Sequence, residues 1–524
     1  MTRFVLPVFL LCLGLAQAAM AQSNRPLAQA MLLMRTEAWE AAISAAHADG
    51  PVAQDIIEWH RLRAGEGTPQ EAMEFLKRRA DWPGLPYLHE RSELGLEGAA
   101  PADVVAFFEG RSPKTPQGVA ALTAALVAVG RAGAAGDAAV EAWRGMALPT
   151  DLRDALLAQF GDALASHHEA RLDLALWEGW EDEARALMPM VSDGWRALAE
   201  ARLALRLQER GVDARIRQVP AELRDHPGLA YERFLWRWEN DRRDAALDLL
   251  LERSDNPQDL GRPDIWARIR AGLARDVMRD GKLRQAYGVA AGHGLLDGAT
   301  YADLEWLAGY LALKGGAAER DAASAHFQRL LVAVDSPISQ ARASYWLGRA
   351  HEAQGKADNA RDAYTFSAGF QTAFYGLLAA ERGGIPVDDR LRGAESFPPW
   401  EQAAWTRSSV YHAAVLLLAA GEEDLSERFF THLAESLDRV QIGQMGAMLR
   451  QLGQPHMQVM LGKRAAAFGH QVPGPYFALH PIALQDHPVP PEMVLAIARR
   501  ESEFNPTVVS PAGARGLMQV MPDT

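Results

Sequence analysis

Apolar residues between position 22 and about position 380 recur at the spacing of α-helices. They almost never alternate with polar residues, as they would in a half-buried strand. The same segment is rich in Ala, Leu and Arg. This pattern predicts an all-α fold for the largest part of the chain.

A short motif recurs along this helical segment: a residue that tolerates a left-handed helix end is followed five residues later by Ala. Such a residue ends the first helix of a hairpin, and the small Ala lets the second helix pack closely against the first. The copies stand at irregular intervals, which predicts a superhelical array of irregular helix hairpins. The four clearer copies and one weaker early copy are Gly179 with Ala184, Asn240 with Ala245, Gly281 with Ala286, Gly355 with Ala360, and Thr36 with Ala41.

One copy of the hairpin motif is sharper than the others. Its residues fall at offsets similar to those of tetratricopeptide repeats, which are also helix hairpins. We therefore expect a tetratricopeptide-like array. The residues that carry the likeness are Leu347, Gly348, Gly355, Ala360 and Tyr364.

Gly, Pro and charged residues interrupt the helical pattern at residues 381–400. Four short helical segments follow between 401 and 469, and a proline-rich stretch then leads to a last helix. These changes predict a repeat domain at 22–380, a linker with a small helical module at 381–470, and the start of a further domain at 471–524.

Residues 1–21 have the layout of a secretory signal peptide: one positive charge, an apolar run at 4–16 and small residues at the end. The apolar run is too short to span a bilayer, so we expect cleavage after Ala21 and export. A lipoprotein attached through Cys12 is disfavoured, because the preceding Leu11 is not small. Cleavage removes the one cysteine, which leaves the exported chain without disulfides.

The formal net charge of -13 disfavours a nucleic-acid partner, because phosphate binding requires a basic face. No later apolar run is long enough for a membrane span. His167, His168 and Glu169 could suggest a metal site, but the spacing of a zinc-binding helix is missing. We expect no metal, no cofactor, no stable membrane span and a monomer.

The last helix is expected to begin at Pro490–Pro491, where the missing N–H is tolerated, and to end at Asn505–Pro506. An apolar stripe runs along it, and an acid stands in this stripe where an apolar residue would be expected. Such a violation of patterning is typical of functional sites. The stripe consists of Val494, Ile497, Ala498 and Glu501.

A carboxylate held against apolar surface loses hydration, so its pKa rises and it can act as a general acid. We therefore predict Glu501 as a catalytic acid. The alternative is that Glu501 pairs with an arginine, since structural ion pairs also place acids on inner faces. Glu503, on the opposite face of the helix, is expected to be an ordinary solvated acid.

A turn-rich loop at 510–516 can return beside this helix and bring a hydroxyl and backbone donors close to the acid. The following Gly516 has no side chain to obstruct a ligand, and Gln519 offers an amide that both donates and accepts. This arrangement favours a sugar-binding cleft around Glu501.

The segments ARRESEFNP and SPAGARGLMQVMP resemble the E-S and G-L-M-Q motifs of lytic transglycosylases, specifically the soluble murein transglycosylases of glycoside hydrolase family 23. The helical middle is similar to the superhelical domain of that family. The likeness implies that residues 471–524 begin a lysozyme-like catalytic domain. It also implies Glu501 as the single general acid and base, and contacts to the glycan from Ser510, Gln519, Met521, Ser502, Gly516 and Met518.

The resemblance further implies cleavage of the β-1,4 bond between N-acetylmuramic acid and N-acetylglucosamine of periplasmic peptidoglycan. The product would carry a 1,6-anhydromuramoyl end, and the sugar's own N-acetyl group would replace an enzymic nucleophile. A superhelix forming a ring or arch that guides a glycan strand, and unidentified partners in the cell-wall machinery, are further expectations from the likeness.

The sequence departs from the family pattern at its end. Members continue through helices with an Ala-Tyr-Asn motif, whereas this sequence stops at Thr524. We expect that it breaks off inside the catalytic domain and that residues 22–524 alone are poorly active. Two alternatives remain open: a periplasmic helical-repeat scaffold or glycan-binding protein without catalysis, and a lysozyme-type hydrolase.

Overall fold

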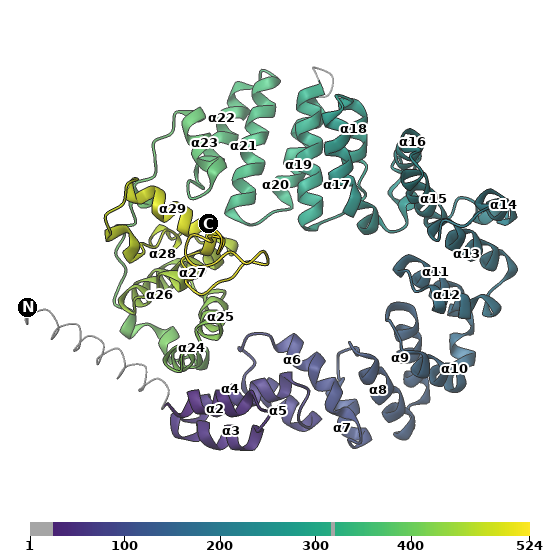
Figure 1. Ribbon diagram of the computed structural model, residues 1–524, viewed down its shortest axis with the longest axis horizontal. Helices are drawn as coiled ribbons and strands as arrows, with labels where there is room; N and C mark the ends of the chain where they lie inside the picture. Colours follow the sequence, from purple (N-terminus) through teal and green to yellow (C-terminus); the bar gives the residue numbers. More distant parts are fainter. Residues whose placement is uncertain (1–24, 316–319) are drawn as a thin grey trace, which may run out of the picture. The chain divides into compact units, whose positions relative to one another are not determined.

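The computed structural model describes residues 25–315 and 320–524. The predicted signal peptide at 1–21 lies outside the described residues. Every regular element in the described part of the chain is a helix, and the only bridges there are two isolated pairs in the C-terminal loop. The predicted all-α fold is confirmed (Figure 1).

The chain divides into two compact units. The first comprises residues up to Gly118 together with residues from Val387 onward, and the second comprises Val119–Pro386. The helices of the first unit are α2 (Pro26–Met34), α3 (Trp39–Ala46), α4 (Pro51–Arg63), α5 (Pro69–Arg78), α6 (Leu85–Ser92), α7 (Pro101–Phe107), α24 (Ser409–Ala419), α25 (Glu423–Ala434), α26 (Arg439–Gln451), α27 (Pro455–Ala467), α28 (Pro473–Tyr476) and α29 (Pro491–Ser502).

The boundary between the units falls inside α8 (Pro116–Ala128). The other helices of the second unit are α9 (Ala132–Gly145), α10 (Thr150–Leu164), α11 (His168–Glu178), α12 (Glu181–Leu187), α13 (Asp193–Arg206), α14 (Val212–Gln218), α15 (Pro227–Glu239), α16 (Arg243–Arg253), α17 (Pro263–Arg279), α18 (Leu283–Ala291), α19 (Gly298–Gly315), α20 (Arg320–Val332), α21 (Pro337–Ala353), α22 (Ala357–Ala368) and α23 (Phe374–Gly383).

In the first unit, the N-terminal helices share a core with the helical module that follows residue 400. The ring of Phe429 on α25 lies edge-on to Trp59 of α4 and to Trp82, with centroid distances of 5.6 and 5.1 Å. The indole N–H of Trp82 donates to the hydroxyl of Ser409 at 2.9 Å. Segments more than 300 residues apart in the sequence therefore pack side by side in this unit.

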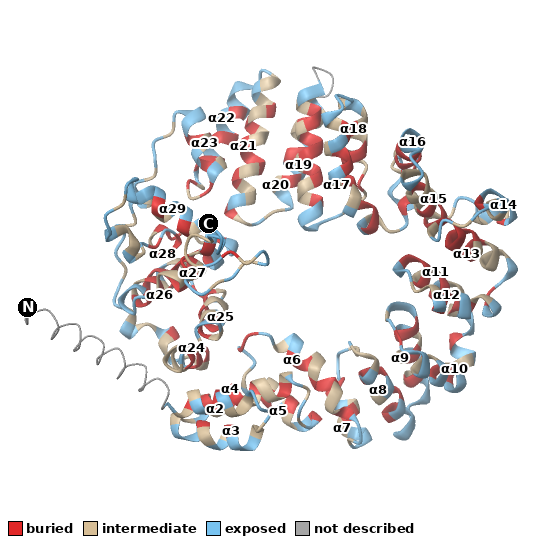
Figure 2. Ribbon diagram, in the orientation of Figure 1, coloured by how far each residue is buried: buried red, intermediate tan, exposed pale blue. Residues whose placement is uncertain are grey.

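The second unit consists of helix hairpins packed in series, and most of its helices bury one side and expose the other (Figure 2). The glycines of the three clearest motif copies all adopt a left-handed φ, between 73° and 79°, and each is followed by a buried Ala.

In α21, a Cβ on Gly348 would lie 2.6 Å from the ring of Tyr364, so this glycine permits the close packing of α21 on α22.

Two predicted copies of the hairpin motif are displaced by one residue. Asp241, and not Asn240, has the left-handed φ of 58°, and Ala246 is buried where Ala245 is exposed. The amide of Asn240 instead donates to the carbonyl of Trp236 at the end of α15. The early copy is displaced likewise, since the left-handed residue is Glu37 and the buried alanine Ala42.

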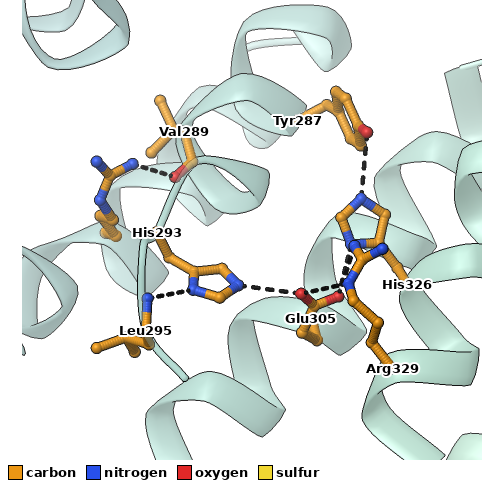
Figure 3. A network of polar contacts seen from close by, with 8 residues as sticks. Tyr287, Val289, His293, Leu295, Glu305, His326 and Arg329 are labelled. Atoms are coloured by element: carbon orange, nitrogen blue, oxygen red, sulfur yellow. Dashed lines mark hydrogen bonds and ion pairs between the residues drawn. The ribbon is translucent and has the colours of Figure 1, made fainter. Parts of the chain in front are cut away.

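A buried polar network joins three helices of the second unit (Figure 3). Glu305 of α19 accepts hydrogen bonds from His293 at 3.2 Å, from His326 of α20 at 2.6 Å, and from Arg329 at 3.0 Å. Tyr287 of α18 contacts the other ring nitrogen of His326 at 3.1 Å. Burial alone would raise the pKa of Glu305, but these hydrogen bonds outweigh it and hold the pKa well below its usual range.

No helix within residues 25–315 and 320–524 is both long and apolar enough to cross a membrane. Across the same residues, no group of three or more His, Cys, Asp or Glu side chains is arranged to hold a metal ion. His168, considered above as a ligand, is buried and lies edge-on to the ring of Trp143.

Candidate functional site

The helix that carries the predicted acid, α29, begins at Pro491, as its proline pair indicated. It ends at Ser502, three residues before the predicted end at Asn505–Pro506. The reason is that Glu503 and Phe504 both adopt left-handed backbone conformations, with φ of 49° and 66°. The chain therefore leaves the helix directly after Glu501 and Ser502.

Two adjacent rows of side chains run along α29, and only one of them is covered. Val494, Ala498 and Ser502 are at most 4% exposed. The neighbouring row is open: Ile497 is 41% exposed, and Glu501 lies one turn further along in the same row. The predicted apolar stripe is thus split between a packed face and an open face.

Glu501 lies on the open face. Within the described part of the chain, its side chain forms no ion pair and no hydrogen bond, so the alternative of an arginine partner is not observed. The predicted burial against apolar surface is also not observed in this structure, because Glu501 is exposed. Its carboxylate is therefore accessible to a ligand from solvent.

Ser502, in contrast, connects α29 to the following loop. Its hydroxyl is hydrogen-bonded to the carbonyl of Ala498 at 3.0 Å and to that of Leu517 at 2.8 Å. With only 4% of the residue exposed, Ser502 is poorly placed for a direct contact with a glycan. Its position is that of a residue that fixes the loop beside Glu501.

Arg499 anchors α29 on its other side. Its Nε donates to the carbonyl of Tyr476 at the end of α28, at 3.0 Å. The guanidinium also lies over the ring of Tyr476, 4.6 Å from the centroid. These contacts fix α29 against the proline-rich segment that precedes it.

Glu503 is not the freely solvated acid that the helical pattern predicted. Its carboxylate forms an ion pair with Lys463 of α27, and its backbone carbonyl accepts a hydrogen bond from His456 at 2.8 Å. The left-handed turn at Glu503 and these contacts with the helical module occur together, directly after the end of α29.

The loop after α29 is held by its own backbone. The N–H of Ser510 donates to the carbonyl of Ala514 at 2.9 Å, and the Ser510 hydroxyl accepts from the Ala514 N–H at 3.0 Å. Arg515 and Val520 exchange backbone hydrogen bonds of 3.0 and 3.1 Å. The predicted turn-rich loop therefore doubles back, as the Ser-Pro-x-Gly pattern indicated.

The remaining predicted residues occupy this same loop. Gln519 donates from Nε2 to the carbonyls of Val508 and Gly516, at 3.1 and 3.0 Å, which leaves its amide oxygen available as an acceptor. Gly516 has a φ of 71°, and nothing lies within 4 Å of where its Cβ would be. Met518 is partly buried in the cluster around Phe504, whereas Met521 is 43% exposed.

Sequence reasoning missed three residues that hold α29 in place: His456, Lys463 and Arg499. His456 and Lys463 lie 47 and 40 residues before their partner Glu503 in the sequence. They belong to an ordinary amphipathic helix, and no motif distinguishes them. Arg499 could have been noted as a cation in the last helical turn, where a positive charge is favoured, but this position does not reveal its contact with Tyr476.

Residues 481–524 match the family described as the transglycosylase SLT domain. The soluble lytic murein transglycosylase of Escherichia coli strain K12 is 28% identical over 157 residues, which are 29% of this chain. The match spans only 24% of that relative's length.

Solved structures resemble the chain over almost all of its length. The 70 kDa soluble lytic transglycosylase of Escherichia coli has a TM-score of 0.52 at 16% identity, covering 97% of this chain and 81% of that one. An inactive mutant of the lytic transglycosylase Slt from Pseudomonas aeruginosa has a TM-score of 0.61 at 20% identity, covering 96% and 81%. The chain therefore matches the transglycosylase SLT domain in residues 481–524 and shares the fold of these solved lytic transglycosylases over nearly its whole length.

Proposed function

We propose that this protein is a peptidoglycan lytic transglycosylase that cleaves the β-1,4 bond between N-acetylmuramic acid and N-acetylglucosamine, with Glu501 as its single general acid and base. The observation that carries the proposal is the state of Glu501. It stands unpaired and accessible on α29, within the segment that matches the SLT domain and beside a loop fixed through Ser502.

The reaction requires one group that first gives and then takes a proton. Glu501 would protonate the departing glycosidic oxygen as the bond to the anomeric carbon breaks. The resulting carboxylate would then remove the proton of the muramoyl 6-hydroxyl while that oxygen bonds to the anomeric carbon. Glu501 thus regains the proton that it gave, no water is consumed, and the product carries a 1,6-anhydro ring.

The loop residues would orient the glycan around Glu501. The Ser510 hydroxyl accepts from Ala514 and so retains its own hydrogen for donation to a sugar oxygen. Gln519 retains its amide oxygen as an acceptor, Gly516 leaves space for a close approach, and exposed Met521 offers apolar contact. Neither the residues nor this chemistry requires a cofactor.

The proposal also assigns a domain to each part of the chain. Residues 471–524 would contribute to the catalytic domain, 381–470 would form the linker module, and 22–380 would form the repeat domain. Because the substrate lies in the cell wall, we propose a periplasmic location after removal of residues 1–21. The ring or arch suggested by the family likeness, and a monomeric state, remain parts of the proposal.

A digest of purified peptidoglycan tests the reaction, with products identified by mass spectrometry. The protein is expressed as residues 22–524 and also with whatever follows Thr524 in the encoding reading frame. Glu501→Gln is expected to lower the rate by about 10²–10⁴-fold, the usual contribution of a general acid. The matched control is Glu492→Gln, an exposed acid in the first turn of the same helix.

The products separate the candidate functions. Anhydromuramoyl ends from the parent and from Glu492→Gln, but not from Glu501→Gln, support the proposal. Reducing ends would favour a lysozyme-type hydrolase. If neither form of the parent releases products, the proposal is wrong, and binding of glycan without cleavage would favour the scaffold.

A further inference from the structure

The two residues that follow Ser502 adopt a backbone conformation that is unusual for their types. Glu503 has φ 49° and ψ 33°, and Phe504 has φ 66°. Side chains disfavour the left-handed region because Cβ approaches the following carbonyl oxygen. Such conformations persist where surrounding contacts hold them, and they are found at functional sites.

One face of α27 supplies these contacts. His456, Val459 and Lys463 stand at positions i, i+3 and i+7 of that helix and therefore share a face. His456 bonds the carbonyl of Glu503, Lys463 pairs with its carboxylate, and Val459 packs in the apolar cluster that buries Phe504. The helical module thus contacts both left-handed residues directly after the helix that carries Glu501.

His456 is a bridge between two acceptors. Its Nδ1 lies 2.8 Å from the carbonyl oxygen of Glu503, and its Nε2 lies 2.9 Å from a carboxylate oxygen of Glu427 on α25. A neutral imidazole has only one N–H, whereas the imidazolium ion has two. Only the protonated ring can therefore donate to both partners at once.

The surroundings of His456 stabilise that protonated form. Burial would lower the pKa of His456, but the hydrogen bonds to Glu427 and to the Glu503 carbonyl outweigh it and raise the pKa above its ordinary value. Lys463 on the same helix is paired with Glu503. Arg428, beside Glu427 on α25, lines a neighbouring cavity of about 500 Å³ together with Lys463.

We propose that His456 and Lys463 are positioning residues for Glu501: they fix the left-handed turn at Glu503 and Phe504, so that the helical module sets the direction of the catalytic carboxylate. The inference rests on the proposed function of Glu501. It gives the module a role in catalysis although none of its residues contacts the reacting atoms.

Amide hydrogen exchange tests the turn without any need for turnover. The backbone N–H of Asn505 donates to the carbonyl of Ser502 at 2.9 Å, so its protection reports whether the turn is closed. We expect His456→Ala to lower the protection factors at residues 503–505 about tenfold. The control is His470→Ala in the same module, because the His470 side chain forms no hydrogen bond or ion pair with the described residues.

Turnover of peptidoglycan tests the consequence for Glu501. We expect His456→Ala and Lys463→Gln to lower kcat about tenfold with little change in KM, because a small misplacement of a reacting group slows chemistry more than binding. Lys463→Arg keeps the cation and should restore most of the rate. The kcat of the parent divided by the kcat of His456→Ala should be largest below about pH 6.5. This ratio should fall as the pH rises through the raised pKa of His456, because the parent then loses the protonated imidazole.

The outcomes separate this inference from the proposed function. Unchanged protection at residues 503–505 in His456→Ala overturns the inference, whether or not the parent cleaves glycan. The inference is also overturned if His456→Ala lowers protection at residues 503–505 but has the same kcat as the parent at every pH. A parent without turnover contradicts the proposed function, and the exchange data then still decide whether the module fixes the turn.

Discussion

Replacement of Glu305 by Gln should destabilise the second unit strongly, although this residue lies outside the candidate site. Glu305 is 3% exposed and accepts hydrogen bonds from His293, His326 and Arg329. The substitution keeps the size of the side chain and removes its charge. It therefore tests the network in Figure 3 without creating a cavity.

The loss of stability expected for Glu305→Gln depends on how exposed each of the three hydrogen-bond donors is. A hydrogen bond to a charged group contributes about 1.5–3 kcal/mol. The side chains of His293 and His326 are only 5% exposed, so they cannot form replacement hydrogen bonds with water. The side chain of Arg329 is 49% exposed and can do so. Gln still accepts from one donor, so we expect a loss of about 3 kcal/mol, or about 6 °C in the melting temperature.

The stability that Glu305 contributes should decrease at acidic pH. Because the folded-state pKa of Glu305 is depressed, its contribution is fully present above the unfolded pKa of about 4.3 and is lost as the pH falls through the folded pKa. The difference between the parent and Glu305→Gln should be constant from pH 7 to pH 5. It should shrink below about pH 4.

Denaturant unfolding followed by circular dichroism at several pH values measures this difference. Glu381→Gln is the matched control, because Glu381 is an exposed acid of α23 in the same unit and should change stability by less than about 0.5 kcal/mol. A Glu305→Gln protein as stable as the parent at pH 7, or a difference that grows on acidification, would refute the reasoning.

Two further predictions concern packing. Gly348→Ala should cost about 1–3 kcal/mol, because its Cβ would meet the ring of Tyr364 at 2.6 Å, whereas Gly272→Ala, with nothing within 4 Å, should not destabilise; thermal melts of both variants check this. Trp82→Phe removes the hydrogen bond to Ser409 and part of a buried ring, and should cost about 2 kcal/mol. Hydrogen exchange should then rise in α4–α6 and in α24 together, and a rise confined to the N-terminal helices would contradict a shared core.

Local sequence patterns predicted the helices well and their long-range partners poorly. The four segments of the module after residue 400 became α24 to α27, since helical periodicity and caps are encoded within each segment. The hairpin motif was displaced by one residue at Asn240, because the choice between neighbouring residues depends on cap contacts that composition does not reveal. The contact between Trp82 and Ser409 spans 327 residues, and no local pattern indicates it.

The candidate site shows the same division between local and long-range information. The motif placed Glu501 on the last helix, and in the structure it lies exposed near the end of α29. The pattern could not tell which of two adjacent apolar rows would be covered, because that depends on the segment packed against the helix. Ile497 stays 41% exposed while Ala498 is fully buried, although both are apolar.

The turn at Glu503 is the clearest case, because its conformation opposes the local preference of the sequence. An unbroken helical pattern runs through this position, and neither Glu nor Phe favours a left-handed φ. The structure ends the helix there because His456 and Lys463 bind Glu503 and the cluster around Val459 buries Phe504. The orientation of the candidate acid therefore depends on a helix that precedes it by about 40 residues, and a site search confined to the SLT segment would overlook it.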